Sequence, residues 1–212
     1  MPDLSSRPAD RHLARPELPL LLVADDGRHA DPLDGIEAGV LLRDTDLSIV
    51  VSRSAVPVPP LAVDIDTIRG LGTDDAAVDF LVDRLSIGIV LTRRPATALH
   101  AAERGVLALL HVLALDSTGL GRSLDAHPRT HGIGTVVSPG LVLRHMLPRE
   151  LDRLPRPILG YGLISEPDDA LACLRLADGI VLRRAPAEAL AARIGPVPLR
   201  IDGRLTTVAV RE

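Results

Sequence analysis

The chain has 212 residues, enough for one α/β barrel or two small domains. Hydrophobic residues make up 46% and charged residues 25%, as in ordinary globular proteins, and no run reaches the roughly 20 apolar residues that a membrane-spanning helix needs. The net charge of −4 argues against a strongly basic nucleic-acid-binding module, although it leaves room for a local basic patch.

Eight short apolar segments predict β-strands. Their apolar runs are continuous rather than alternating, which is typical of parallel strands covered on both faces. Most of them are followed by polar residues and then by a helix signal. The predicted strands span residues 19–24, 39–43, 61–66, 88–92, 107–115, 134–138, 157–160 and 179–182.

The segment after the third strand predicts an amphipathic helix. Thr73 is its expected N-cap. The negative charges of the two aspartates that follow would interact favourably with the positive end of the helix dipole. Apolar residues then recur at i, i+3, i+4 and i+7, which predicts one buried stripe. The stripe consists of Val78, Leu81, Val82 and Leu85.

Proline, glycine and capping signals predict three more helices. Pro95 is expected at the first position of a helix that stops at Gly105. Ser165 and Asp168 have the spacing of a capping box. A further helix is expected to start at Pro186 and end before residue 195.

A βα unit that repeats about every 20–25 residues predicts a TIM-like (β/α)8 barrel, with an open doubly wound sheet as the alternative. The connections after the first two strands are short and Pro-rich (52–60), which leaves little room for full helices. Residues 197–210 alternate around Asp202-Gly203, as in a hairpin. We therefore expect a disordered tail at 1–16, the barrel at 17–195 and a C-terminal hairpin extension at 196–212.

The ends of the seventh and eighth strands are candidates for phosphate binding, because (β/α)8 barrels commonly bind phosphate there. Gly160 and Gly162 would let backbone amides approach an anion, and Arg183 and Arg184 would supply guanidinium groups. The alternative is that the glycines only permit turns and the arginines are solvated. Tyr161, between the glycines, would either close over a ligand or block the site.

The third and fourth strands end in a second polar group. Thr92 and Arg93 precede a Pro-led helix and could bind an anion, or Arg93 could pair with Asp66. Asp64 and Asp66 would face the same way on a regular strand. Such a pair could bind Mg²⁺, hydroxyl groups or arginine, and we favour a polyol hydroxyl bound to Asp66 over a metal site or an acid/base dyad.

Asp116 and Ser117 follow the fifth strand, where a helix cap and a ligand contact are both plausible roles. His111 lies inside that strand and is expected to be a hydrogen-bonded core or lumen histidine. Cys173 is the only cysteine, and its apolar helix predicts a buried, unreactive thiol. The chain has no catalytic triad order, nucleotide-binding loop or metal-ligand spacing, so no cofactor or metal is expected.

Five blocks of the chain resemble, in order and in spacing, the bacterial glycerol-3-phosphate-responsive antiterminator family. They are Val-Asp-Ile-Asp-Thr-Ile-Arg-Gly-Leu (63–71), Gly-Ile-Val-Leu-Thr-Arg-Arg (88–94), Leu-Asp-Ser (115–117), Pro-Gly (139–140) and Pro-Ile-Leu-Gly-Tyr-Gly-Leu-Ile (157–164). The resemblance covers roughly residues 60 to 184. The chain departs from the family pattern in having Asp64 in place of a histidine, Tyr161 in place of a glycine, and Leu-Arg-Arg at 182–184 in place of Ser-Thr-Ser.

This resemblance implies a TIM-like barrel that binds glycerol 3-phosphate or a similar phosphorylated polyol, acts on a messenger-RNA leader and carries out no catalysis. It also adds Gly140 to the expected ligand-binding residues. The residues themselves give little support to RNA binding, because Phe80 and Tyr161 are the only aromatic side chains available for stacking. We expect a cytoplasmic regulator without a membrane partner. The open alternatives are a divergent barrel enzyme using Asp64 or Asp66 as acid/base, a degenerate barrel used for interaction, and a homodimer.

Overall fold

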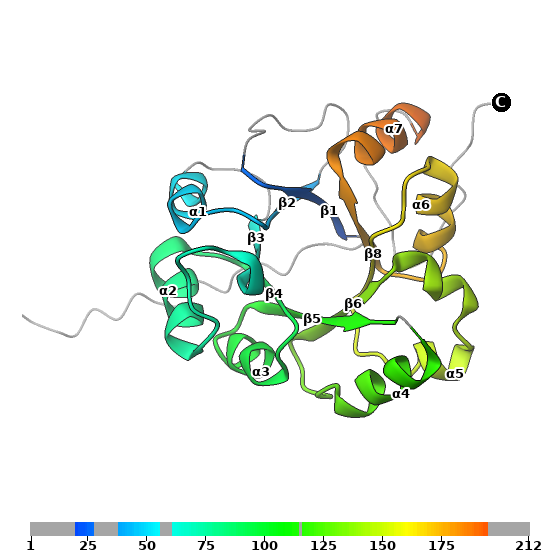
Figure 1. Cartoon of the computed structure of the whole chain (residues 1–212), viewed down its shortest axis with the longest axis horizontal. Helices are drawn as coiled ribbons and strands as arrows, with labels where there is room; N and C mark the ends of the chain where they lie inside the picture. The colour runs from blue at the N-terminus through cyan, green and yellow to red at the C-terminus, as the bar shows by residue number, and fades with distance from the viewer. Residues whose placement is uncertain (1–19, 28–37, 56–60, 115, 195–212) are drawn as a thin grey trace, which may run out of the picture.

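The computed structural model describes residues 20–27, 38–55, 61–114 and 116–194. Eight parallel strands form a closed barrel in chain order, and β1 pairs with β8 to complete the ring (Figure 1). This closure confirms the predicted (β/α)8 barrel and rules out the open sheet. The strands are β1 (Leu20–Asp25), β2 (Gly39–Leu42), β3 (Leu61–Asp64), β4 (Ile89–Thr92), β5 (Leu107–Leu113), β6 (Ile133–Ser138), β7 (Ile158–Tyr161) and β8 (Gly179–Arg183).

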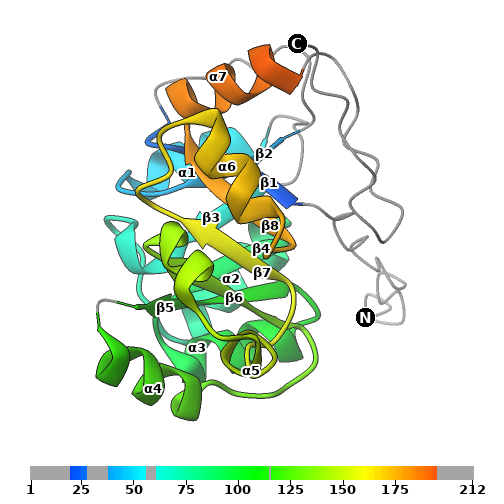
Figure 2. The ribbon, with the colours of Figure 1, turned by 90° about the vertical axis from the view of Figure 1, so that its right-hand side faces the viewer.

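Helices surround the barrel and cover the outer face of its strands (Figures 1 and 2). None of the helices within the described ranges is both long enough and apolar enough to cross a membrane. The α-helices are α1 (Leu47–Ser54), α2 (Asp75–Leu85), α3 (Pro95–Glu103), α4 (Ser117–Ala126), α5 (Pro148–Leu151), α6 (Pro167–Leu174) and α7 (Arg184–Ile194), and two 3₁₀ helices are η1 (Ile65–Thr67) and η2 (Gly140–His145).

Alternation along each strand divides the core into an inner and an outer layer. The inner cluster fills the barrel with aliphatic side chains such as Leu41, Ala62 and Leu109. The outer clusters lie between strands and helices and include Val63 under α2 and Val137 on the opposite side. Because both faces of the strands are buried, their sequences are continuously apolar, which is the signal that predicted them.

Several local predictions are confirmed, and others are corrected by a residue or two. Pro95 begins α3, and Gly105 follows its C-cap with φ +81° and donates its amide to the Ala102 carbonyl at 3.0 Å. The N-cap of α2 is Asp74 rather than Thr73, because the Asp74 carboxylate accepts the Ala77 amide at 3.0 Å. Thr73 instead accepts, through its carbonyl, a hydrogen bond from Thr97 at 2.8 Å.

Three further boundaries differ from those predicted. The capping box at Ser165 and Asp168 does not form; Glu166 takes the N-cap position with no side-chain bond, and Pro167 follows at the first helical position. Helix α7 begins directly after β8, at Arg184, two residues before Pro186. The Pro-rich connection is shorter than expected, because its first residues complete the eight-residue helix α1. The predicted tail at 1–16 and the hairpin at 196–212 lie outside the described residues.

Candidate functional site

Polar side chains form a ring at the carboxyl ends of the strands. Each lies two residues beyond an inner core residue, so alternation directs it toward the barrel axis above the aliphatic core. The barrel interior therefore changes from Leu, Ile and Val to charged and aromatic groups at this end, which we call the mouth. The residues of this ring that matter here are Arg43 (β2 end), Asp64 (β3), His111 (β5), Tyr161 (β7) and Arg183 (β8).

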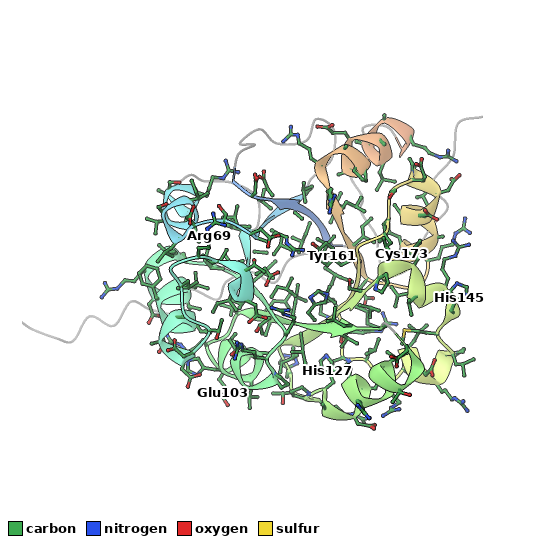
Figure 3. All side chains as sticks on the ribbon, in the orientation of Figure 1. Arg69, Glu103, His127, His145, Tyr161 and Cys173 are labelled. Carbon is green, nitrogen blue, oxygen red and sulfur yellow. The ribbon has the colours of Figure 1, made fainter. Side chains whose placement is uncertain are left out.

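Tyr161 lies at the mouth (Figure 3), where its ring is close to a cation and to an imidazole. The Arg43 guanidinium carbon lies 5.2 Å from the centroid of the Tyr161 ring, within the range of a cation–π interaction. On another side, the His111 and Tyr161 ring centroids are 5.7 Å apart with an interplanar angle of 52°. Tyr161 therefore sits between Arg43 and His111 rather than lying free over the opening.

His111 has an unused hydrogen-bonding atom. Its Nε2 is buried and has no hydrogen-bond partner among the described residues, so the predicted satisfied histidine is wrong. Burial, helped by the positive charges of Arg43 and Arg93, lowers the pKa of His111 to about 4, so the imidazole is neutral at pH 7. A neutral imidazole can accept or donate one further bond, which makes this atom a potential ligand contact.

Asp64 is a buried carboxyl group in the same ring. Only 5% of the residue is exposed, and burial raises its pKa to about 6, with the negative charge of Asp66 adding to the rise and Arg43 opposing it. Near neutral pH this group can therefore gain or lose a proton.

Asp66 does not continue the strand as expected. It lies in η1, and its carboxylate turns toward the end of β4, where it accepts the Arg93 amide at 2.6 Å and the Thr92 hydroxyl at 3.2 Å. The Arg93 and Arg94 side chains approach it at 3.3 and 3.4 Å. With only 3% of its side chain exposed, Asp66 joins β3 to β4 through these bonds, and a ligand would have to displace one of them.

A cavity of about 550 Å³ opens at the mouth between the ends of β1, β2, β7 and β8. Tyr161 forms part of its wall. Its arginines and aspartates are equal in number, so the cavity combines both charges rather than forming a uniformly basic surface. The charged residues that line it are Arg43, Arg183, Arg184, Asp25, Asp26 and Asp44.

The arginines of this cavity are not equivalent. The Arg43 Nε lies 2.8 Å from the Asp44 carboxylate, and Arg184 forms an ion pair of the same length with Glu188 one helical turn on. Arg183 is exposed and has no ion-pair or hydrogen-bond partner among the described residues. Among the described residues that line the cavity, Arg183 is therefore the cation that is free to bind an anion.

The predicted glycines have different environments. Gly162 has φ +76° and starts a loop in which its own amide and that of Leu163 form no hydrogen bond within the described part of the chain. Gly160 lies inside β7, where a Cβ atom would come within 2.2 Å of the Cys173 sulfur. Gly140 donates its amide to the Gly162 carbonyl at 3.0 Å. Gly162 is thus open to an anion, whereas Gly160 and Gly140 are occupied by packing and backbone bonding.

Asp116 is the N-cap of α4, where its carboxylate accepts the Gly119 amide at 2.6 Å. Ser117 is the first residue of this helix. We expect Asp116→Ala to lower the free energy of unfolding by about 1 kcal/mol, as N-cap removal usually does, and to leave ligand binding at the mouth unchanged. Urea denaturation would measure the loss, and Asp116→Asn, which keeps a capping oxygen, is the matched control. Weaker ligand binding by Asp116→Ala would instead indicate a direct contact.

The structure divides the predicted site residues into separate groups. Asp66, Thr92 and Arg93 form one cluster, Arg183 and Arg184 line the cavity, and Asp116 caps a helix. The sequence interpretation treated Asp64 and Tyr161 only as open alternatives at the ligand site, and it did not assign Arg43 or His111 to that site. The i+2 spacing from the apolar strand residues would have identified them. In the described part of the chain, no group of three or more His, Cys, Asp or Glu side chains could hold a metal ion.

Comparison with known proteins agrees with this architecture. A family model described as "Glycerol-3-phosphate responsive antiterminator" matches residues 45–181. The chain belongs to this family. Among curated proteins, none matches its sequence.

Solved structures share the fold of this family member at low sequence identity. A glycerol uptake operon antiterminator-related protein from Thermotoga maritima is 23% identical, with a TM-score of 0.66 over 80% of this chain and 97% of that one. A glycerol uptake operon antiterminator regulatory protein from Listeria monocytogenes is 15% identical, with a TM-score of 0.63 over 77% and 91%. Phosphoribosyl anthranilate isomerase from Thermotoga maritima is 11% identical, with a TM-score of 0.50 over 78% and 88%. These likenesses support the barrel fold.

Proposed function

We propose that this antiterminator-family protein is a cytoplasmic regulator that binds glycerol 3-phosphate, or a similar phosphorylated polyol, at the mouth of its barrel. Through this ligand it acts on a messenger-RNA leader so that transcription of glycerol-use genes continues. The observation that carries the ligand proposal is the cavity at the ends of β7 and β8. There Arg183, which has no ion-pair or hydrogen-bond partner among the described residues, ends β8 directly before α7.

The phosphate and the hydroxyl groups of such a ligand would contact different residues at the mouth. Arg183, the open amides of Gly162 and Leu163 and the N-terminal turn of α7 supply cationic and N–H groups for a phosphate. Toward the barrel axis, hydrogen-bonding atoms for hydroxyl groups come from Asp64 and from His111 Nε2, which has no partner in the part of the chain that the structure describes. A short polyol with one phosphate matches this division.

Thermal unfolding with added glycerol 3-phosphate tests the ligand. At a concentration one hundred times the Kd, binding to the folded state adds about 2.7 kcal/mol, which corresponds to a rise in Tm of roughly 5–10 °C for a chain of this size. We expect Arg183→Ala to weaken binding about tenfold or more, because it removes a charge-assisted hydrogen bond. Arg84→Ala, at an exposed position on α2, is the matched control. No Tm rise in the unmodified protein, or an equal rise in Arg183→Ala, would contradict the assignment.

One observation favours the alternative of a barrel enzyme. Asp64 is a buried carboxyl group whose raised pKa, about 6, suits an acid/base catalyst near neutral pH. An enzyme would show turnover of a phosphorylated metabolite that Asp64→Asn abolishes while ligand binding persists. A regulator would show binding without turnover, and gel retardation of a structured leader RNA that depends on glycerol 3-phosphate.

A further inference from the structure

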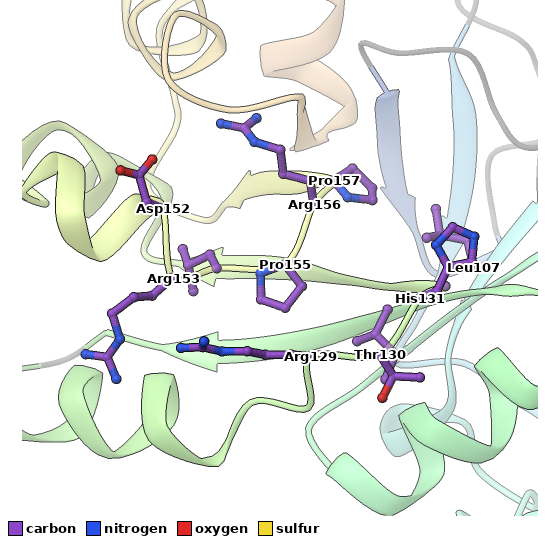
Figure 4. A pocket seen from close by; sticks show the side chains of 12 residues that line it. Leu107, Arg129, Thr130, His131, Asp152, Arg153, Pro155, Arg156 and Pro157 are labelled. Carbon is purple, nitrogen blue, oxygen red and sulfur yellow. The ribbon is translucent and has the colours of Figure 1, made fainter.

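A second cavity, of about 620 Å³, lies at the opposite end of the barrel from the mouth (Figure 4). It is formed at the amino-terminal ends of β5, β6 and β7 by the segments 129–133 and 152–157, together with Leu107. Its volume falls within the range of small-molecule and nucleotide pockets. The aliphatic core of the barrel lies between the mouth and this cavity, so the two cavities are separate in space.

Arginine dominates the charged lining of this cavity. Arg129, Arg153 and Arg156 line it with a single carboxylate, Asp152. Arg153 pairs with Asp125 and Arg156 with Asp178, and their side chains remain 40% and 60% exposed. Arg129 has no ion-pair or hydrogen-bond partner in the described ranges. Each guanidinium has five N–H donors, so the pairing of two of them leaves donors and planar faces open.

Much of the remaining lining is apolar. Leu107, Leu154, Pro155 and Pro157 contribute apolar surface, and in the view of Figure 4 Pro155 lies between Arg129 and Arg156. Proline fixes its own φ, so this wall needs little ordering when a ligand binds. His131 also lines the cavity. Unstacked RNA bases stack on His rings and Arg guanidinium planes, and their phosphates pair with Arg, so this lining suits a nucleotide of single-stranded RNA.

The charge of the two cavity linings favours the same end for a polyanion. This cavity has three arginines and one aspartate in its lining, whereas the chain as a whole has a net charge of −4. The mouth cavity, in contrast, has three aspartates for its three arginines. A polyanion would therefore be attracted to the amino-terminal end more than to the mouth.

We propose that this amino-terminal cavity is the RNA-contacting surface, where one unstacked base of a single-stranded segment enters between Pro155 and the arginines while Arg129 binds a neighbouring phosphate. The proposal rests on the proposed function, in which the protein acts on a messenger-RNA leader. It also separates the two activities in space, with the polyol phosphate at one end of the barrel and RNA at the other.

Fluorescence anisotropy with a labelled single-stranded RNA of about 12 nucleotides and mixed sequence, in the presence of glycerol 3-phosphate, tests this surface. We expect Arg129→Glu to weaken binding about tenfold and to reduce the slope of log K against log salt by roughly 0.7, because one RNA phosphate is no longer neutralised by the protein. The matched control is Arg84→Glu, which makes the same charge change on α2, away from the cavity. Both variants should keep the wild-type Tm and its rise with glycerol 3-phosphate.

Each other outcome has a distinct meaning. Equal weakening by Arg129→Glu and Arg84→Glu would show a non-specific charge effect and overturn the proposal. No RNA binding by the wild-type protein at low salt, with the glycerol 3-phosphate shift intact, would overturn the RNA surface and leave the ligand assignment standing. RNA binding that depends on Arg129 without any glycerol 3-phosphate shift would support this surface and contradict the proposed ligand. Displacement of RNA by polyglutamate as readily as by unlabelled RNA would point to an acidic protein partner instead.

Discussion

Gly160→Ala should lower the free energy of unfolding by about 1–3 kcal/mol, the usual cost of overpacking a core. The added Cβ would lie 2.2 Å from the Cys173 sulfur and 3.3 Å from a methyl group of Leu143, both of which are fully buried. Cys173 packs α6 against β7, so the extra methyl group would push the helix away from the strand. The variant should be measured by urea denaturation, with Gly88→Ala as control, because a Cβ at Gly88 meets nothing within 4 Å.

A second substitution separates packing from ligand binding at Gly160. The clash is with the sulfur itself, so Cys173→Ala should recover most of the stability that Gly160→Ala removes, a non-additivity expected of residues in contact. Burial raises the pKa of Cys173 to about 11, so its replacement removes no reactive thiolate. If the double variant folds and still binds glycerol 3-phosphate, Gly160 is a packing residue. If it folds and no longer binds, the predicted phosphate contact is correct. A Gly160→Ala variant as stable as wild type would contradict the packing of α6 on β7.

The barrel could be predicted because its strands are buried on both faces, which leaves a continuous apolar signal in each. The helix ends were predicted less well, since a cap depends on which side chain reaches an open amide. Thr73 and Asp74 both have capping side chains, and only the geometry of the turn selects Asp74. Arg184 likewise begins α7 because the chain turns directly out of β8, although Pro186 is the stronger sequence signal.

The site could be located at the carboxyl ends of the strands, but the partner that each side chain selects could not be predicted. Strand alternation would place Asp66 beside Asp64, yet η1 rotates it toward the Arg93 amide. Two candidate glycines look alike in the sequence, although Gly162 needs its positive φ and Gly160 makes room for a sulfur atom. The missing information concerns neighbours across the barrel, which are distant along the chain.

The pH dependence of stability should change in opposite directions when Asp64 and His111 are replaced. Asp64 has a folded pKa of about 6 against an ordinary 3.8, so the folded protein holds its proton more tightly than the unfolded chain does. Its contribution to stability is fully present below pH 3.8 and is lost as pH rises to 6, an effect of roughly 3 kcal/mol. The Asp64→Asn variant does not suffer this loss. The free energy of unfolding of the variant minus that of wild type should therefore rise between pH 4 and 6 and stay raised at pH 7.

His111 has the opposite sign. Its folded pKa is about 4 against an ordinary 6.5, so the unfolded chain binds the proton more tightly. Its contribution is fully present above pH 6.5 and is lost as pH falls to 4, again by roughly 3 kcal/mol. The His111→Gln variant does not suffer this loss. The free energy of unfolding of the variant minus that of wild type should therefore rise as the solution is acidified from pH 6.5 to 4.

In the wild-type protein these two contributions nearly cancel between pH 4 and 6, so neither is visible until one group is removed. Urea denaturation at several pH values would measure the difference in the free energy of unfolding between each variant and wild type. As pH rises, this difference should increase for Asp64→Asn and decrease for His111→Gln. The His145→Gln variant, at an exposed position, serves as control for the removal of an imidazole. If both variants instead follow the wild-type curve in parallel, Asp64 and His111 are not buried together at the mouth. Binding of a ligand that hydrogen-bonds to either group should shift the corresponding pH window, which connects the stability measurement to the site.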